Sequence, residues 1–121
     1  MPPAPIRGNG GSPRGRADGD RQPPRMARVV IEVDGKAVSE RQLDKPILTI
    51  GRLSTNDVQV PSQRVSRLHA RLRWENGTWV IEDADSLNGI MYQGKRVDWH
   101  ELRNGDQIAL TPKVTLRYES V

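Results

Sequence analysis

Apolar and polar residues alternate in short runs along most of the chain, and the clearest run is His69–Glu75. Its apolar residues point to one face and its two arginines to the other. Strict alternation is typical of a strand with one buried face. The pair Asn76-Gly77, which favours a tight hairpin turn, follows directly and leads into a second strand-like run. The sequence therefore predicts a β-hairpin over residues 69–83.

Runs of the same kind recur from residue 28 to the end of the chain. Further strand-like runs lie at 28–33, 47–52, 90–92, 95–97, 107–111 and 114–118. No segment keeps a sustained helical period, and turn pairs such as Asp34-Gly35 separate the runs. Short strands with turns every ~8–12 residues are typical of a sandwich or barrel. We expect an all-β fold in which residues 28–121 form one β-sandwich domain.

Residues 1–27 lack this alternation and consist mainly of Pro, Gly and Arg. Ordering each residue would cost roughly 1–2 kcal/mol of backbone entropy, and no apolar burial offsets it, so we expect a disordered tail. Up to Arg28 the chain holds six Arg and two Asp, which accounts for the whole formal net charge of +4. A flexible arginine arm can contact nucleic acid. Because no aromatic residue is there for base stacking, a nucleic-acid partner is the weaker interpretation of this tail.

Composition removes several classes of protein. No run approaches the ~18 apolar residues of a membrane span, and the N-terminus lacks the apolar core of a secretory signal. The 121 residues include no Cys and only two His. This excludes disulfides, thiolate zinc sites and cysteine nucleophiles. We expect a cytoplasmic protein that holds no metal and no cofactor.

Three polar clusters fall at the ends of predicted strands, where loops often carry binding residues. They are Gly51-Arg52, V-S-R-L-H-A at 65–70 and D-A-D-S-L-N-G at 83–89. Together with I-G-R-L-S-T-N-D-V-Q-V and L-R-N-G-D-Q-I, this order of motifs resembles the forkhead-associated (FHA) family over residues 28–120. The resemblance implies a sandwich of about eleven short, mostly antiparallel strands with recognition loops at one end. It also implies that the chain binds phosphothreonine in partner proteins and catalyses no reaction.

The resemblance assigns the phosphate to three residues. Arg52 matches the family arginine that contacts phosphate, Ser66 matches a serine that contacts it through its hydroxyl and its amide, and Arg67 lies where a second cation often reaches. These residue types suit the ligand, because phosphothreonine carries about −1.5 to −2 charge at pH 7 and three strong acceptor oxygens. An arginine fork and a hydroxyl donor satisfy such oxygens. Taken alone, Arg52 is better explained as a solvated strand-end charge or a member of a structural ion pair, and Ser66 could be a turn-capping serine; the full pattern favours phosphate contact.

The resemblance assigns the peptide to the loop at 84–89. Asn88 matches the asparagine that holds the peptide backbone, a task that needs both a donor and an acceptor. Read alone, Asn88-Gly89 is a type I′ turn signal. Ser86 and Leu87 belong to the segment expected to set the choice of residue after the phosphothreonine. Leu87 and Ile90 stand where family members carry Thr or a polar residue, which bears on peptide preference more than on phosphate binding.

Four further residues are expected to support the loops without touching the ligand. Gly51 and Gly89 match the glycines that permit the turns. His69 matches a histidine that braces the loop from inside, and we expect it to form hydrogen bonds within the loop. Asn56 is expected to shape the loop that follows Arg52.

An enzyme is the least favoured interpretation of these residues. Ser66 and His69 lack a third group to orient them, and the acidic residues at 82–85 sit on consecutive positions that face opposite sides. Two binding alternatives stay open: a phosphate-independent interaction or self-association module, and a nucleic-acid binder that acts through the tail. We predict a monomeric phosphothreonine-recognition module that recruits a partner marked by an upstream serine/threonine kinase.

Overall fold

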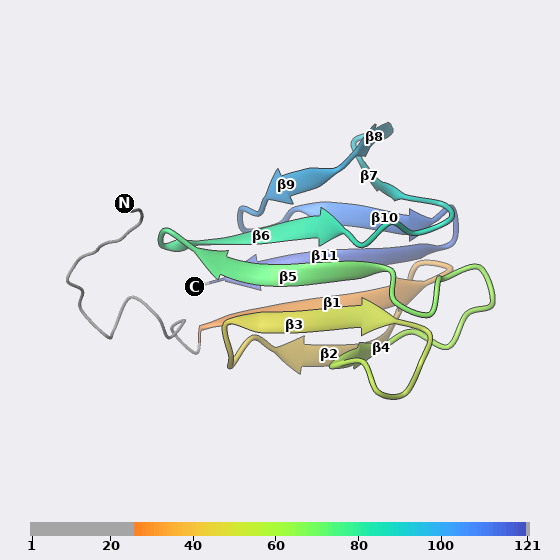
Figure 1. The fold of residues 1–121 in the computed structure, drawn as a ribbon, viewed down its shortest axis with the longest axis horizontal. Helices are drawn as coiled ribbons and strands as arrows, with labels where there is room; N and C mark the ends of the chain where they lie inside the picture. The colour runs from red at the N-terminus through yellow and green to blue at the C-terminus, as the bar shows by residue number, and fades with distance from the viewer. Residues whose placement is uncertain (1–25, 121) are drawn as a thin grey trace.

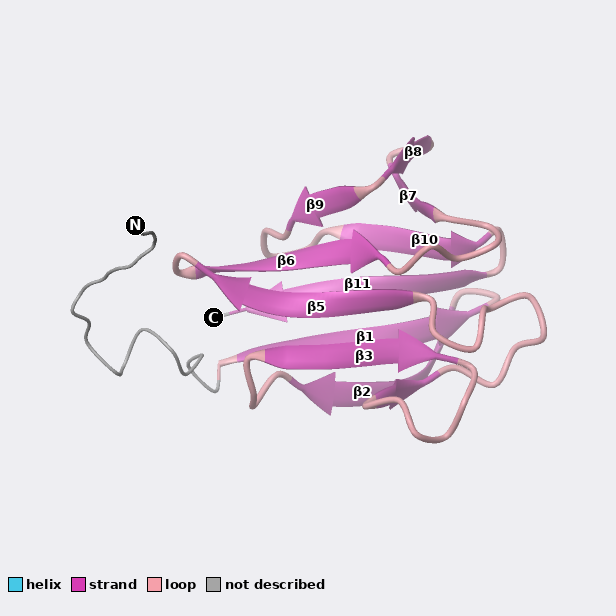
Figure 2. Cartoon of the chain, in the orientation of Figure 1, coloured by secondary structure: helices cyan, strands magenta, loops and turns pink. Residues whose placement is uncertain are grey.

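The computed structural model describes residues 26–120, which form two β-sheets packed face to face (Figures 1 and 2). The strands are β1 (Ala27–Val33), β2 (Lys36–Gln42), β3 (Ile47–Gly51), β4 (Val58–Gln59), β5 (Ala70–Glu75), β6 (Thr78–Asp83), β7 (Ile90–Tyr92), β8 (Lys95–Val97), β9 (Trp99–Glu101), β10 (Gln107–Thr111) and β11 (Val114–Ser120). Every regular element in this part of the chain is a strand, so the predicted all-β sandwich is confirmed. The disordered tail predicted over 1–27 lies outside the described residues, apart from its last two.

The two sheets place strands that are distant in sequence side by side. One sheet has the order β2-β1-β11-β10-β7-β8 and the other has the order β4-β3-β5-β6-β9. Paired strands run antiparallel except β3 and β4, which are parallel. Ala27 pairs with Ser120, and the β1–β11 pairing continues to Val33 and Val114. β1 thus begins one residue before the predicted domain boundary.

The core fills the space between the sheets and follows the alternation seen in the sequence. In β11, Val114, Leu116 and Tyr118 are buried, whereas Thr115 and Arg117 are half-buried. The largest fully buried apolar side chains come from both sheets and their connections: Trp79, Ile31, Leu43, Leu48, Ile50, Leu72, Ile81, Ile90, Ile108, Leu110 and Leu116. Each buried aliphatic side chain contributes roughly 1.5–3 kcal/mol. This core gives the loops rigid points of attachment.

Three two-residue turns have the backbone of a type I′ hairpin. Their φ angles are 53° and 81° at Asp34-Gly35, 54° and 82° at Asn76-Gly77, and 51° and 81° at Gln93-Gly94. Positive φ at both positions is what this turn requires, and Asn, Asp and Gly tolerate it best. β5 and β6 pair along their whole length around the second of these turns, so the predicted hairpin is confirmed.

The alternation pattern does not predict three of the strands, β2, β4 and β9. β2 lies at an edge of the six-stranded sheet, and six of its seven residues are exposed. A strand that is exposed on both faces needs no apolar alternation, so the sequence carries no signal for it. β4 and β9 contain two and three residues, which is too short for any period to show.

The loops that carry the expected site residues lie at one end of the sandwich, at the right in Figure 1, and we call this the recognition end. They are the β3–β4, β4–β5 and β6–β7 connections. The β5–β6 turn and the β9–β10 loop lie at the opposite end. No helix in residues 26–120 is long and apolar enough to cross a bilayer.

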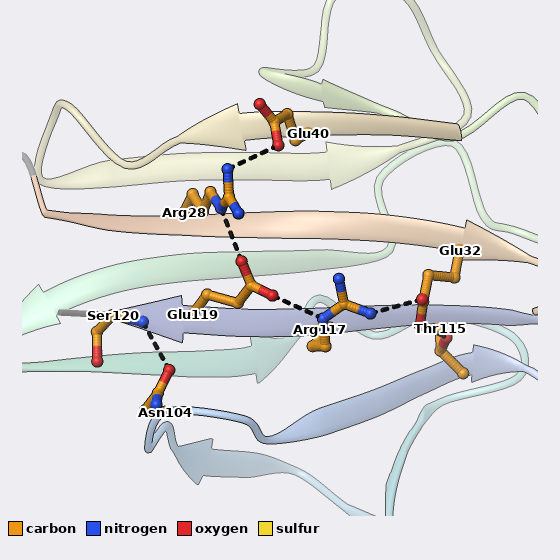
Figure 3. A network of polar contacts seen from close by, with 8 residues as sticks. All are labelled: Arg28, Glu32, Glu40, Asn104, Thr115, Arg117, Glu119 and Ser120. Carbon is orange, nitrogen blue, oxygen red and sulfur yellow. Dashed lines mark hydrogen bonds and ion pairs between the residues drawn. The ribbon is translucent and has the colours of Figure 1, made fainter. Parts of the chain in front are cut away.

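A chain of ion pairs covers the outer face of the six-stranded sheet (Figure 3). Arg28 on β1 pairs with Glu40 on β2 at 3.0 Å and with Glu119 on β11 at 2.7 Å. Arg117 pairs with Glu119 at 2.9 Å and with Glu32 at 2.6 Å. The hydrogen bond from Arg28 and then that from Arg117 lower the pKa of Glu119 below its ordinary value. Charges of both signs therefore link β2, β1 and β11.

Candidate functional site

His69 connects the loops of the recognition end through both its backbone and its ring. Its amide donates to the carbonyl of Ile50 at 2.7 Å, and its carbonyl accepts from the amide of Ala84 at 2.9 Å. Nδ1 accepts from the amide of Ser66 at 3.1 Å, which places the ring proton on Nε2, and Nε2 donates to the carbonyl of Gly89 at 2.8 Å. The imidazole is completely buried. Both ring nitrogens are thus used inside the protein, as a bracing role requires.

Gly51 and Asn56 bring the β3–β4 and β4–β5 loops into contact. A Cβ at position 51 would lie 2.2 Å from the carbonyl oxygen of Arg67, so this close approach requires glycine. The side chain of Asn56 donates to the same carbonyl at 2.7 Å and to the carbonyl of Leu53 at 2.9 Å. Both residues fix the loop backbone and leave the ligand contacts to others.

Arg52 follows β3 and is held by the neighbouring loop. Its amide donates to the carbonyl of Ser66 at 3.0 Å, and its Nε donates to the carbonyl of Val65 at 3.1 Å. Within residues 26–120 no carboxylate pairs with its guanidinium. Backbone contacts therefore anchor a cation whose charge the described part of the protein does not neutralise.

Ser66 offers its hydroxyl to a ligand but not its amide. Its Oγ accepts from the amide of Leu87 at 3.0 Å, which leaves the hydroxyl proton available for donation. Its amide already donates to His69. Of the two groups of Ser66 expected at the phosphate, the amide is therefore engaged by the histidine brace and the hydroxyl proton is free.

Leu87 and Asn88 stand at the tip of the β6–β7 loop, and both are exposed. Nδ2 of Asn88 donates to the carbonyl of Arg64 at 2.8 Å, which joins this loop to the β4–β5 loop. Gly89 has a φ of +76°, but Asn88 is not among the described residues with positive φ. The pair is therefore not the type I′ turn that it resembles in sequence. Leu87 is 85% exposed, so both side chains are accessible beside Ser66.

A groove of about 580 Å³ opens beside Asn88. Its other lining residues belong to β7, β10, β11 and the adjoining turns: Met91, Gln93, Gly94, Gln107, Ala109, Leu110, Thr111, Pro112 and Thr115. Much of this lining is apolar. An extended segment held at Asn88 would therefore meet an apolar surface on this side.

Ser86 and Ile90 both face inward, although Ser86 was expected to contact the peptide. Ser86 is only 7% exposed, and its Oγ donates to Asp83 and accepts from the amide of Gly89 at 2.8 Å. Its hydroxyl is therefore used inside the loop, because the buried Gly89 amide needs an internal acceptor. Ile90 is completely buried. The isoleucine that stands in place of the family threonine thus belongs to the core.

Sequence reasoning missed two cations near these loops. Arg64 is exposed, and its carbonyl is the acceptor for Asn88. Arg96 on β8 lies against Gly89, since a Cβ on that glycine would come within 2.4 Å of the arginine Nε. Like Arg67, neither pairs with a carboxylate in the part of the chain that the structure describes. No motif marks the two positions, and only the contacts between loops and strands reveal them.

Asp57, in the loop after Arg52, is neutralised inside the protein. Its carboxylate accepts from the amide of Thr49 at 2.9 Å and pairs with Lys45 at 2.5 Å. Burial acts to raise the pKa of Asp57, but the hydrogen bonds from Lys45 and Thr49 outweigh it and leave the pKa below its ordinary value. This carboxylate therefore does not compete with a ligand for the arginine of its loop.

Ser66 and His69 do not form a nucleophile and its base. The ring nitrogens of His69 contact a backbone amide and a backbone carbonyl, and the hydroxyl of Ser66 contacts the amide of Leu87. An activated serine needs a base hydrogen-bonded to its hydroxyl. The acidic residue Glu82 on β6 pairs with Arg73 on the neighbouring strand β5, so its carboxylate is used within the sheet. Among residues 26–120 no group of three or more side chains could hold a metal ion.

Known proteins share this sequence pattern. The family model described as FHA domain matches residues 48–111. The glycogen accumulation regulator GarA of Mycolicibacterium smegmatis is 34% identical over 88 residues, which cover 73% of this chain and 56% of the regulator. An oxoglutarate dehydrogenase inhibitor of Corynebacterium efficiens is 30% identical over 100 residues, which cover 83% of this chain and 70% of the inhibitor. This chain thus spans little more than half the length of GarA.

Solved structures share the fold. The Slr1951 protein from Synechocystis sp. has a TM-score of 0.71 and 35% identity, with 83% of this chain and 97% of that chain covered. Mycobacterium tuberculosis EmbR, solved in complex with a low affinity phosphopeptide, has a TM-score of 0.68 and 28% identity, with 78% of this chain and 24% of that chain covered. The family model, the relatives and the two-sheet fold agree, and the chain belongs to the FHA domain family.

Proposed function

We propose that the folded part of this chain binds phosphothreonine in a partner protein and so recruits that partner after a serine/threonine kinase has modified it. The observation that carries the proposal is Arg52, a cation anchored by Val65 and Ser66 with no carboxylate partner in residues 26–120. Related structures support it. One is EmbR with its phosphopeptide, and another, at 26% identity, comes from work on phosphothreonine-dependent FHA domain interactions.

The available donors suit a phosphate group. Arg52 supplies a fork of N–H donors, Ser66 supplies a short hydroxyl donor, and Arg67 adds a second cation from the same loop as the serine. Two cations balance the charge of about −1.5 to −2 that phosphothreonine carries at pH 7, and charge-assisted hydrogen bonds are roughly twice as strong as neutral ones. His69 and Asn56 hold the loops in place. Little conformational freedom would then be lost when the ligand binds.

Asn88 is suited to hold the backbone of the peptide. A carboxamide has two N–H donors and one acceptor oxygen. After donating to the carbonyl of Arg64, Asn88 keeps one donor and its acceptor for the N–H and C=O of an extended peptide. Exposed Leu87 and the groove beside Asn88 offer apolar surface to the residues that flank the phosphothreonine.

The proposal is tested by titrating the full chain with an oriented phosphothreonine peptide library and with the same library unphosphorylated. We expect binding to the phosphorylated set only. A matched peptide with Asp in place of phosphothreonine should bind far more weakly, because Asp has about half the charge and fewer acceptor oxygens. Equal dissociation constants for the phosphorylated peptide and either control would overturn the proposal.

A phosphate-independent interaction module is the second candidate, favoured by apolar side chains exposed in the β3–β4 and β6–β7 loops. Leu53 is 45% exposed and Leu87 is 85% exposed. Binding of the unphosphorylated library would favour this candidate.

Deleting residues 1–25 tests the nucleic-acid alternative. An affinity for nucleic acid that depends on the tail would vanish on deletion, and in the full chain it would fall steeply with salt. Phosphopeptide affinity should survive the deletion.

A further inference from the structure

β9 leads to the end of the sandwich opposite the recognition loops, and it carries an exposed tryptophan. It is the last strand of the five-stranded sheet, so no other strand of residues 26–120 pairs with its free side. The side chain of Trp99 is 64% exposed, whereas Trp79 is buried and Trp74 is partly buried. Glu101 lies two positions further along β9 and is also exposed. The side chains of Trp99 and Glu101 therefore project from the same face of the strand.

A hollow of about 300 Å³ lies beside Trp99 and Glu101. Its other lining residues come from β5, β6 and the turn between them: Arg73, Glu75, Asn76, Thr78 and Val80. The cation of this lining is engaged, because Arg73 pairs with Glu75 at 3.0 Å and also with Glu82. Glu101 accepts from the Thr78 hydroxyl at 3.3 Å, but it pairs with no cation of residues 26–120. The hollow therefore combines an exposed indole with a carboxylate that is not neutralised.

A second carboxylate adds to the negative charge around Trp99. Asp98 directly precedes it, is exposed, and likewise has no cationic partner in the described part of the chain. Arg103 shares a neighbouring hollow with Glu101 but forms no ion pair with it. A guanidinium stacks on the face of a tryptophan and donates to a carboxylate through its planar fork. An arginine from another segment therefore suits this surface.

The chain itself supplies such arginines in residues 1–25. This segment contains five Arg and two Asp, a formal net charge of +3. It joins the described part of the chain beside Ala27, which pairs with Ser120. The amide of Ser120 donates to Oδ1 of Asn104 at 3.0 Å (Figure 3), and Asn104 follows Glu101 by three residues. The segment therefore enters the domain at the end to which β9 leads.

The segment is long enough to reach Glu101. Facing residues of paired strands have Cα atoms about 5.5 Å apart, and three residues span at most about 10 Å. With the hydrogen bond between Ser120 and Asn104, these steps place Ala27 and Glu101 within roughly 25 Å of each other. Arg16 precedes Ala27 by 11 residues, and an extended chain of that length spans up to about 36 Å. Arg14 reaches farther still.

We infer that residues 1–25 bind the domain that they precede, with Arg14 or Arg16 stacked on Trp99 and hydrogen-bonded to Glu101. The contact is intramolecular and lies away from the recognition loops, so the inference does not rest on the proposed function. It gives the arginine-rich segment a partner within its own chain and leaves the loops open. A segment held in this way has part of its charge neutralised, so it is less available to nucleic acid.

The first test compares variants of the full chain at low ionic strength. Trypsin cleaves after Arg14 and Arg16, and mass spectrometry of the fragments gives the rate at each site. A bound arginine is shielded, so W99L and E101Q should each raise these rates about two- to fivefold, as for an exposed cation–π contact or ion pair. At about 1 M salt, where the Debye length is about 3 Å, the effect of E101Q should disappear.

D34N is the matched control for E101Q. Asp34 is also exposed and has no cationic partner in residues 26–120, but it lies in the β1–β2 turn at the recognition end. D34N should be cleaved at the wild-type rates.

The second test leaves the folded part of the chain unchanged. R14Q/R16Q alters only the segment, and Trp99 is the one exposed tryptophan of the three in the chain. Quenching of tryptophan fluorescence by acrylamide should therefore increase in R14Q/R16Q. R64Q/R67Q is the matched control, because it removes two exposed arginines at the recognition end, and its quenching should equal that of the wild type.

Four results would overturn the inference. Wild-type cleavage rates in W99L and E101Q would show that β9 does not hold the segment, and unchanged quenching in R14Q/R16Q would show that these arginines do not cover Trp99. Rates that vary with protein concentration would assign the contact to a second copy of the chain. Affinity for a phosphothreonine peptide should be the same in wild type and R14Q/R16Q, and a change would place the segment at the recognition end.

Discussion

Two regions of this molecule use arginine in opposite ways. On the outer face of the six-stranded sheet, Arg28 and Arg117 each pair with two carboxylates (Figure 3). At the recognition end, Arg52, Arg64 and Arg67 pair with no carboxylate of the described residues. Exposure does not explain the difference, because the side chain of Arg28 is 51% exposed and still paired. Arg28 and Arg117 thus contribute to the fold through their ion pairs, whereas the arginines of the recognition end keep no carboxylate partner within residues 26–120 and suit the proposed phosphate ligand.

The two regions also differ in how they are held together. The sheet face is linked from side chain to side chain, by ion pairs near the surface that contribute little to stability. The recognition end is linked from side chain to backbone, through His69, Asn56 and Asn88. Losing the contacts of His69 strands backbone groups that are buried or partly buried, which costs roughly 1–3 kcal/mol. Variants of the bracing side chains at the recognition end should therefore lower both stability and binding, whereas variants of the sheet face should lower stability slightly and leave binding unchanged.

The largest effect is expected for His69→Ala. The change leaves the amide of Ser66 and the carbonyl of Gly89 without their partner, and it empties a buried space. We expect the free energy of unfolding to fall by about 2–4 kcal/mol and phosphopeptide binding to be lost with the loop geometry. Chemical denaturation and peptide titration measure the two effects. A variant with wild-type stability and affinity would show that the recognition end does not depend on this brace.

The next largest effect is expected for Arg52→Ala. Removing a charge-assisted contact should weaken phosphopeptide binding by about 10–100-fold, or roughly 1.5–3 kcal/mol. The free energy of unfolding should change by less than about 1 kcal/mol, because no carboxylate of the described part loses a partner. Arg28→Ala is the matched control and should show the reverse: slightly lower stability and unchanged affinity. Wild-type titration curves from the Arg52 variant would remove this residue from the site.

Ser86→Ala tests whether this serine serves the loop or the ligand. The change leaves the amide of Gly89 without its acceptor, so we expect a loss of stability of about 1–2 kcal/mol. Affinity should fall only a few-fold, through displacement of the adjacent Asn88. The opposite result, a large loss of affinity at full stability, would restore Ser86 as a direct peptide contact. Thermal melts and titrations of the same sample decide between the two.

The smallest effect is expected for Glu119→Gln, in the ion-paired face. At pH 7 the loss of stability should be small, because the pairs of Glu119 lie at the surface, and binding should be unchanged. The folded state lowers the pKa of Glu119, so the stability it contributes is complete above the ordinary carboxyl value of about 4.3. That contribution is lost as the pH falls through the lower folded-state pKa. Denaturation curves of variant and wild type should therefore converge below about pH 4, and a gap that widened there would contradict the assignment.

Local pattern was enough to predict the hairpin of β5 and β6 and the position of the loops. Alternation in His69–Glu75 and the turn at Asn76-Gly77 act within a few residues, so the sequence displays them directly. The inward orientation of the Ser86 side chain was not predictable in this way. Its hydroxyl is needed as an acceptor only because the fold buries the amide of Gly89, which no local pattern shows. β2 gave no signal because an edge strand buries neither face.

The arginines at positions 64 and 96 show the same limit of prediction from local sequence. Arg64 and Arg96 stand in no motif, and nothing in their neighbours along the chain sets them apart from the arginines that pair on the sheets. Their importance comes from contacts across the fold, with Asn88 for the first and Gly89 for the second. Whether an arginine has a carboxylate partner depends on which residues the fold brings next to it, and the sequence alone does not show this.

The pairing of Ala27 with Ser120 has a consequence for how such a domain is carried by other chains. The two residues lie side by side at the end of the sandwich away from the recognition loops. Any polypeptide joined at either residue is therefore attached at the end of the sandwich opposite the recognition loops. Domains with adjacent termini can be inserted into longer chains with little disturbance. A segment attached at this position therefore starts from the end of the domain that is farthest from the recognition loops.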